Sequence, residues 1–319
     1  MIDVTGKFKS KKFPEHVDAS MLSNFGCGFR GAAKAFYGIT VGGSISGHLI
    51  AGKAFAAAME AYRDVFYKGE TKDHELALQA AVKAALTSMG GTTIYDYESS
   101  KTPLRVLDAI VQTLDNSYTN GVEYEVLVLE GKPAVEWMFS IPLPETDSLG
   151  RNICHPDTGL PLNYVGVMDA IVNYYGMICP LDDKTTRGFS PVWRDSWDLR
   201  PQFVGYVWAL RKAGIESAGV LVNGVSFPYN KTPAEEAAIL HGNELVVATI
   251  PEYVIENWYQ QLLLNLHEMI EAYKKERYPQ NWEMCQAYGR TCSYMPFCKG
   301  TTVPYTTEYW QPLKRLEIL

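Results

Sequence analysis

The sequence has no hydrophobic run long enough to cross a bilayer, and its first residues, MIDVTGKFKSKK, lack the apolar stretch of a signal peptide. We therefore expect a cytoplasmic protein that does not enter a membrane. Positive charge is also in deficit, since the net charge is -7 and the pI is near 5.5. This excludes a globally basic nucleic-acid-binding protein, but it leaves room for a local basic track beside an acidic metal site.

The sequence also lacks repeats, low-complexity tracts and any arrangement of Ser, His and Asp typical of a hydrolase triad. Its six histidines show no zinc-hydrolase spacing. Apolar residues make up 47% and charged residues 20% of the 319 residues, which is the balance of a folded globular protein. We expect one domain over residues 1–319, with a helical part over about 1–120, a catalytic core over 121–250 and a C-terminal part over 251–319.

Hydrophobic periodicity predicts helices towards both ends of the chain and a sheet in the middle. Alanine and aromatic residues at helical spacing indicate the helices, and β-branched segments bounded by turn residues indicate the strands. The predicted helices cover 49–67, 74–88, 103–116, 198–213 and 251–277, and the predicted strands cover 123–130, 134–143, 163–175, 177–183 and 217–227. The expected fold class is therefore α/β, a mixed central sheet flanked by helices, with N-terminal helices and a cysteine-rich C-terminal tail.

Two acidic residues and a lysine fall on neighbouring predicted strands. Asp169 lies within one strand, and Asp182 closes the next strand across a turn at Gly176. Such a hairpin can bring the two carboxylates together, and Lys184 projects to the same side as Asp182. Asp183 projects the other way, although its backbone carbonyl can still face the site as a third metal ligand. These oxygens suit Mg²⁺ or Mn²⁺, and the lysine can stabilise charge on a phosphate; a solvated surface hairpin is the alternative.

The next predicted helix places Gln202 and Tyr206 one turn apart on one face. With GVMD at 166–169 and DDK at 182–184, these residues resemble the RecB-like branch of the PD-(D/E)XK nucleases. That branch carries a G-x-x-D strand, a D-x-K strand and a Q-x-x-x-Y helix in this order. The resemblance implies a restriction-endonuclease-like core. The roles that it implies are metal binding by Asp169 and Asp182, catalysis by Lys184, and contacts beside the site and the DNA strand by Gln202 and Tyr206.

One position departs from the pattern of these nucleases. The family usually carries a metal-binding histidine in a helix before the core, within G-x-x-x-H-x-x-x-E. Here Gly52 and Glu60 match that setting, and Glu60 is taken as the family acid, but Ala56 stands in place of the histidine. His48 lies two helical turns earlier and is a candidate substitute.

Three cysteines lie close together in the C-terminal tail. Gly289 and Pro296 interrupt regular secondary structure between Cys285, Cys292 and Cys298. Three thiols in such a segment are typical of a metal-binding loop. The resemblance supplies a fourth ligand, because related AddB-type nucleases place one cysteine before the core and three after it, around a [4Fe–4S] cluster. Cys27 holds that first position here. Zn²⁺ is the alternative occupant of the four thiolates, and buried free cysteines are the alternative to any cofactor.

The resemblance implies a metal-dependent deoxyribonuclease that works on DNA with a free end, an exonuclease of the short kind found in phages and prokaryotes. It acts in recombination, repair or phage DNA processing, and a homo-oligomer is compatible with it. A catalytically weakened DNA-binding accessory protein is the first alternative, which the absent histidine allows. The second alternative is a nucleotide hydrolase, since GHLIAGKA at 47–54 approaches a phosphate-binding loop, but Ala54 replaces the residue whose hydroxyl would bind Mg²⁺.

Overall fold

The structure is a computed structural model that describes residues 11–40, 47–69, 72–90, 102–121, 123–227, 241–289, 291–299 and 305–306. The chain divides into two compact units, and each unit combines segments that are far apart in the sequence. Unit 1 comprises Met1–Gly43, Met138–Gly166 and Ile255–Leu319, and unit 2 comprises Ser44–Trp137 and Val167–Val254. A single domain built from three consecutive parts stays a prediction.

A mixed sheet forms the centre of the fold, which confirms the predicted α/β class. Its order is β1-β7-β8-β9-β10, and β3 and β6 also pair with β7. β7 runs antiparallel to β8, β8 parallel to β9, and β9 antiparallel to β10. The strands are β1 (His16–Val17), β3 (Tyr124–Val126), β6 (Val135–Pro142), β7 (Asn163–Tyr174), β8 (Met177–Thr186), β9 (Gly219–Ser226) and β10 (Asn243–Thr249). Two short pairs complete the strands, β2 (Ile39–Thr40) with β11 (Tyr305–Thr306) and β4 (Val128–Leu129) with β5 (Lys132–Pro133).

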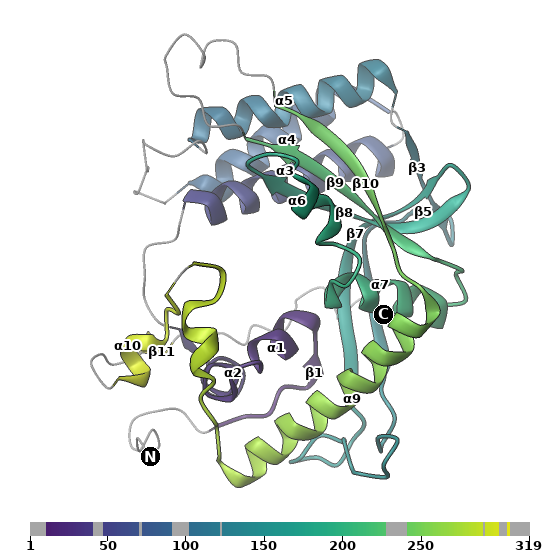
Figure 1. Ribbon diagram of the computed structural model, residues 1–319. Helices are drawn as coiled ribbons and strands as arrows, with labels where there is room; N and C mark the ends of the chain where they lie inside the picture. The colour runs from purple at the N-terminus through teal and green to yellow at the C-terminus, as the bar shows by residue number, and fades with distance from the viewer. Residues whose placement is uncertain are drawn as a thin grey trace. The chain divides into compact units, whose positions relative to one another are not determined.

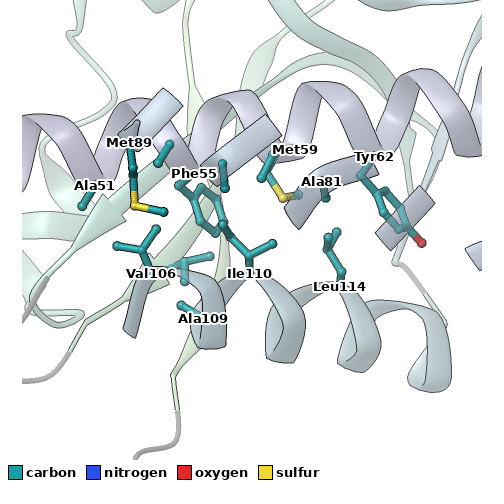
Figure 2. Close-up of a cluster of buried hydrophobic side chains, with 14 of the residues drawn as sticks. Ala51, Phe55, Met59, Tyr62, Ala81, Met89, Val106, Ala109, Ile110 and Leu114 are labelled. Atoms are coloured by element: carbon teal, nitrogen blue, oxygen red, sulfur yellow. The ribbon is translucent and has the colours of Figure 1, made fainter. Parts of the chain in front are cut away.

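Three helices of unit 2, α3 (Gly47–Lys68), α4 (His74–Met89) and α5 (Pro103–Asn120), lie side by side over one face of the sheet (Figure 1). Small alanine side chains let α3 and α4 approach closely, while larger side chains fill the space towards α5 (Figure 2). Asp73 and Thr102 start the second and third helices by accepting the N–H groups of Leu76 and Arg105. The buried residues include Ala51, Ala54, Phe55, Ala58, Met59, Ala77, Ala81, Ala85, Ile110 and Leu114, with Val225 and Phe227 from the sheet. These helices follow the predicted ones closely.

Helix α7 (Pro201–Lys212) packs on the sheet from the other side and is buried along most of its length. The short helix α6 (Pro191–Asp195) precedes it. Between them a row of aromatic rings connects Phe189, Trp193, Trp197 and Phe203, with successive ring centroids 5.0, 5.2 and 5.7 Å apart. This row fixes the segment that joins β8 to α7, and it therefore sets where α7 begins.

Unit 1 contains α1 (Ala19–Asn24), α2 (Gly28–Ala35), most of α9 (Glu252–Lys275), a 3₁₀ helix over Trp282–Gly289 and α10 (Met295–Cys298). Aromatic rings join its first and last segments, because the ring centroid of Phe36 lies 5.1 Å from that of Tyr273 and 6.0 Å from that of Tyr278. Tyr294 donates to the carbonyl of Ile39 over 2.8 Å. Residues 36–39 and 273–294 are thus held together within this unit. Among the described helices, none is long and apolar enough to cross a membrane.

Candidate active site

The two predicted carboxylates meet on one face of the β7–β8 hairpin. The antiparallel register pairs Ala170 with Leu181, so Asp169, which precedes Ala170, lies across from Asp182, which follows Leu181. The backbone N–H of Asp183 donates to Oδ2 of Asp169 over 2.9 Å, which fixes that carboxylate against the neighbouring strand. The Asp182 side chain is buried, with 2% of the residue exposed. Two acidic groups of unit 2 are therefore held together, Asp182 away from bulk water and Asp169 partly buried beside it.

Burial raises the pKa of Asp169 well above its ordinary value, and the charge of Asp182 beside it adds to the shift. Burial also raises the pKa of Asp182, although the Lys184 ammonium opposes this increase. Two anions in this position repel each other and lack water to solvate them. Their ionised forms therefore require positive charge close by, which is the property expected of ligands for a divalent cation.

Lys184 supplies part of that positive charge. It lies two residues after Asp182 on the same face of β8, and its Nζ forms an ion pair with Oδ2 of Asp182. Its Nζ also lies 5.7 Å from the centre of the Phe203 ring on α7. A quarter of the Lys184 side chain remains exposed, so the ammonium group can reach a ligand at the site.

The first turns of α7 complete this face of the site. Gln202 donates through Nε2 to the hydroxyl of Tyr206 over 2.7 Å, and the same Nε2 lies 3.4 Å from Oδ1 of Asp182. The Tyr206 hydroxyl donates to the backbone carbonyl of Val167 over 2.6 Å. The structure thus brings the Q-x-x-x-Y pair into contact with the G-x-x-D and D-x-K strands, as the order of the motifs predicts.

Asp183 points to the opposite face of β8, as strand alternation predicts. Arg63 of α3 grips its carboxylate with two hydrogen bonds, from Nη1 to Oδ2 over 2.5 Å and from Nη2 to Oδ1 over 3.0 Å. Asn223 of β9 donates to the same Oδ1 over 2.7 Å, and Asn243 of β10 donates to Asn223 over 2.8 Å. The Asp183 side chain is fully engaged there, so its predicted metal contact rests on the backbone carbonyl alone.

Sequence reasoning missed Arg63, although one signal was present. Met59, Phe66 and Tyr67 lie one helical turn before and after it, and an unpaired arginine packed among such side chains would be costly. Burial alone would lower the pKa of Arg63, but the Asp183 carboxylate more than offsets this and holds it above the ordinary value. Arg63 and the asparagines also line a cleft of about 920 Å³ whose walls include Tyr67 and Tyr124.

The donor set near the carboxylates fits a hard cation with a large share of water ligands. Among the described residues, no three His, Cys, Asp or Glu side chains are arranged to hold one metal ion. Asp169 and Asp182 therefore offer two carboxylates, to which the carbonyl of Asp183 can add a third oxygen. Mg²⁺ keeps several waters and is commonly held by one or two carboxylates, and Mn²⁺ takes similar ligands.

Helix α3 carries the positions where the sequence departs from the nuclease pattern. Ala56 is exposed and Glu60 is partly buried. The side chain of His48 lies outside the described residues. Residues 47–54 form the first two turns of α3, so the nucleotide-hydrolase alternative is wrong on this point. A phosphate-binding loop must leave the helical path so that its N–H groups surround the phosphates, and these residues do not.

The four cysteines predicted to bind a cofactor come together within unit 1. Cys27, Cys285, Cys292 and Cys298 line one cavity of about 310 Å³. Burial and the other three thiols raise the pKa of Cys298 to about 11. Cys154 and Cys179 are buried and do not line this cavity, and all six cysteines are free. Within the part of the chain that the structure describes, the thiols that line the cavity are not arranged around one shared metal ion.

Comparisons with known proteins give only distant likenesses. No protein-family model matches the chain, and the search of curated proteins gives no match. A crystal structure named "Putative exonuclease" from Eubacterium rectale is similar with a TM-score of 0.46 and 11% identity, over 92% of this chain and 90% of that one. The crystal structure of SSO0001 is similar with a TM-score of 0.29 and 12% identity, over 78% of this chain and 86% of that one. Both TM-scores lie below 0.5, so the functional argument rests on the site itself.

Proposed function

We propose that this protein is a metal-dependent deoxyribonuclease with a PD-(D/E)XK core. The observation that supports it best is the pairing of the buried Asp182 with the partly buried Asp169, with Lys184 on the same face and Gln202 and Tyr206 against it. An unrelated surface hairpin would leave these charges solvated. The proposed reaction is hydrolysis of a phosphodiester bond in DNA.

Each residue of the site then has a distinct task. Asp169 and Asp182 would hold Mg²⁺ or Mn²⁺, which supplies the acidity that makes a water nucleophilic at neutral pH. Lys184 stabilises the negative charge that develops on the phosphate oxygens during attack. Gln202 holds the Asp182 carboxylate in place, and Tyr206 anchors Gln202 to the backbone of β7. Burial excludes competing water from the carboxylates, so electrostatic interactions there are stronger than at the surface.

The cavity in unit 1 suits a [4Fe–4S] cluster held by its four cysteines, with Zn²⁺ as the alternative. What supports a cofactor there is that all four cysteines line the same cavity of about 310 Å³. Its role would be structural, because it joins Cys27 near the beginning of the chain to three cysteines near the end. Such a link lowers the entropy of the unfolded chain and stabilises the folded one.

The substrate we propose is DNA with a free end, which makes the protein an exonuclease of recombination, repair or phage DNA processing in the cytoplasm. Linear and circularised DNA of the same sequence, single- and double-stranded, would be incubated with the protein and Mn²⁺. Degradation of the linear forms alone supports the exonuclease, and cleavage of circles points to an endonuclease. Binding without cleavage of any form would instead support the accessory DNA-binding protein, the alternative that Ala56 favours.

A further inference from the structure

We propose that Arg63 is a positioning residue for the metal site. By binding the Asp183 carboxylate on the opposite face of β8, it fixes the strand that places Asp169 and Asp182. This inference rests on the proposed function, since it concerns the affinity of the same carboxylates for Mg²⁺ or Mn²⁺. Arg63 does not touch the reacting atoms. It acts through the middle residue of the D-x-K motif, which in this chain is an aspartate.

The path from Arg63 to the metal site is short and consists of direct hydrogen bonds. Two guanidinium nitrogens bind the two carboxylate oxygens of Asp183, over 2.5 and 3.0 Å. The backbone N–H of the same Asp183 donates to Oδ2 of Asp169 over 2.9 Å. A rotation of residue 183 would therefore move the N–H that orients Asp169 and the peptide unit that it shares with Asp182.

The geometry of the Arg63–Asp183 ion pair makes this contact rigid. The side chains of Arg63 and Asp183 are each only 2% exposed, so solvent does not weaken the pair. A planar guanidinium bound at two points fixes direction as well as distance, which a lysine ammonium cannot do. Asn223 from β9 occupies the remaining acceptor position of Oδ1, and Asn243 from β10 supports Asn223. Side chains from α3 and β9 thus bind one carboxylate of β8, and β10 supports it through Asn223.

The position of Arg63 on α3 adds a second argument. It lies two helical turns after Ala56 and therefore on the same side of the helix. In this chain, Arg63 connects α3 to β8 directly, whether or not a metal is bound. The helix therefore contributes to the site by orienting the carboxylates.

The test measures metal binding by the full-length protein in addition to its nuclease activity. Mn²⁺ is titrated by calorimetry into the wild type, Arg63→Lys and Asp183→Asn, and the thermal unfolding of each protein is recorded without metal. Arg63→Lys keeps the charge but removes the two-point grip, and Asp183→Asn keeps the shape but removes the charge. Asn223→Ala is a milder third variant in case the first two do not fold. Arg194→Lys is the matched control, because Arg194 forms a comparable two-point pair with Glu244 at the surface.

We expect folded Arg63→Lys and Asp183→Asn to bind Mn²⁺ about 10–100-fold more weakly than the wild type, as is typical when a group that orients metal ligands is changed. Arg194→Lys should bind like the wild type. Unchanged Mn²⁺ affinity in folded variants would overturn the inference and leave Arg63 a purely structural residue. A wild type whose Mn²⁺ binding is insensitive to Asp169→Asn would instead contradict the proposed metal site, so the two failures are distinguishable.

Discussion

Removal of one partner of the buried ion pair between Arg63 and Asp183 gives a stability prediction of definite sign and size. In Arg63→Met the Asp183 carboxylate stays buried and loses two of its hydrogen bonds. Loss of one partner of a buried pair costs about 3–5 kcal/mol. For a unit of this size that corresponds to a fall in Tm of roughly 6–20 °C.

The double variant Arg63→Met/Asp183→Leu should be more stable than Arg63→Met. It removes both charges, and replacing a buried ion pair by apolar side chains is often nearly neutral. One cost remains, because the amide of Asn223 loses its acceptor at Asp183, and an unpaired buried donor costs about 1–3 kcal/mol. The double variant should therefore lie between the wild type and Arg63→Met.

The assay is urea unfolding of the wild type, Arg63→Met, Asp183→Leu and the double variant, followed by tryptophan fluorescence and by circular dichroism. Agreement of the two signals establishes that one transition is being compared. A loss below about 1 kcal/mol in Arg63→Met, the size expected of an exposed pair, would refute the reasoning. So would a double variant that is less stable than both single variants, since the mutual dependence of the charges would then be absent.

Two further predictions concern the carboxylates and the cysteines. Because burial raises the pKa of Asp169 above its ordinary value of 3.8, the contribution of this carboxyl to the stability of the metal-free wild type should be lost as the pH rises above about 4. Asp169→Asn should not show this loss and should melt at a higher temperature than the metal-free wild type at pH 7; an equal or lower Tm contradicts the burial argument. Cys292→Ser should lose the visible absorption and most of the bound iron of protein purified without oxygen, and should unfold more readily, whereas Cys154→Ser should keep its iron. Equal iron content in the two variants would contradict the cluster.

The sequence pattern predicted the helices and the hairpin because both have strong local signals. The alanine-rich helix α3 and the turn at Gly176 depend on residues close together in the chain, so periodicity and turn chemistry suffice. Strand β10 was not predicted. All but one of its residues are partly or fully exposed. Its place at the edge of the sheet depends on pairing with β9, which no local sequence pattern predicts.

The residues of the candidate site also divide into those that local spacing predicts and those that depend on tertiary packing. The face formed by Asp182 and Lys184 could be predicted from a spacing of two residues on a strand, and Gln202 and Tyr206 from a spacing of four on a helix. The opposite face could not, because Arg63 and Asp183 are far apart in the chain and their pairing depends on how α3 packs on the sheet. The arrangement of the four cysteines around one cavity likewise depends on the packing of unit 1.

The measurement that tests the central claim most directly is single-turnover cleavage of end-labelled DNA with Mn²⁺, for the wild type, Lys184→Ala and Lys83→Ala. Lys83 is an exposed lysine on α4 and serves as the matched control. The account predicts that Lys184→Ala lowers the cleavage rate by about 10²–10³, the usual effect of removing one group that stabilises transition-state charge, while Lys83→Ala cleaves like the wild type. Cleavage by Lys184→Ala at the wild-type rate, or no cleavage by a folded wild type that binds Mn²⁺, would contradict it.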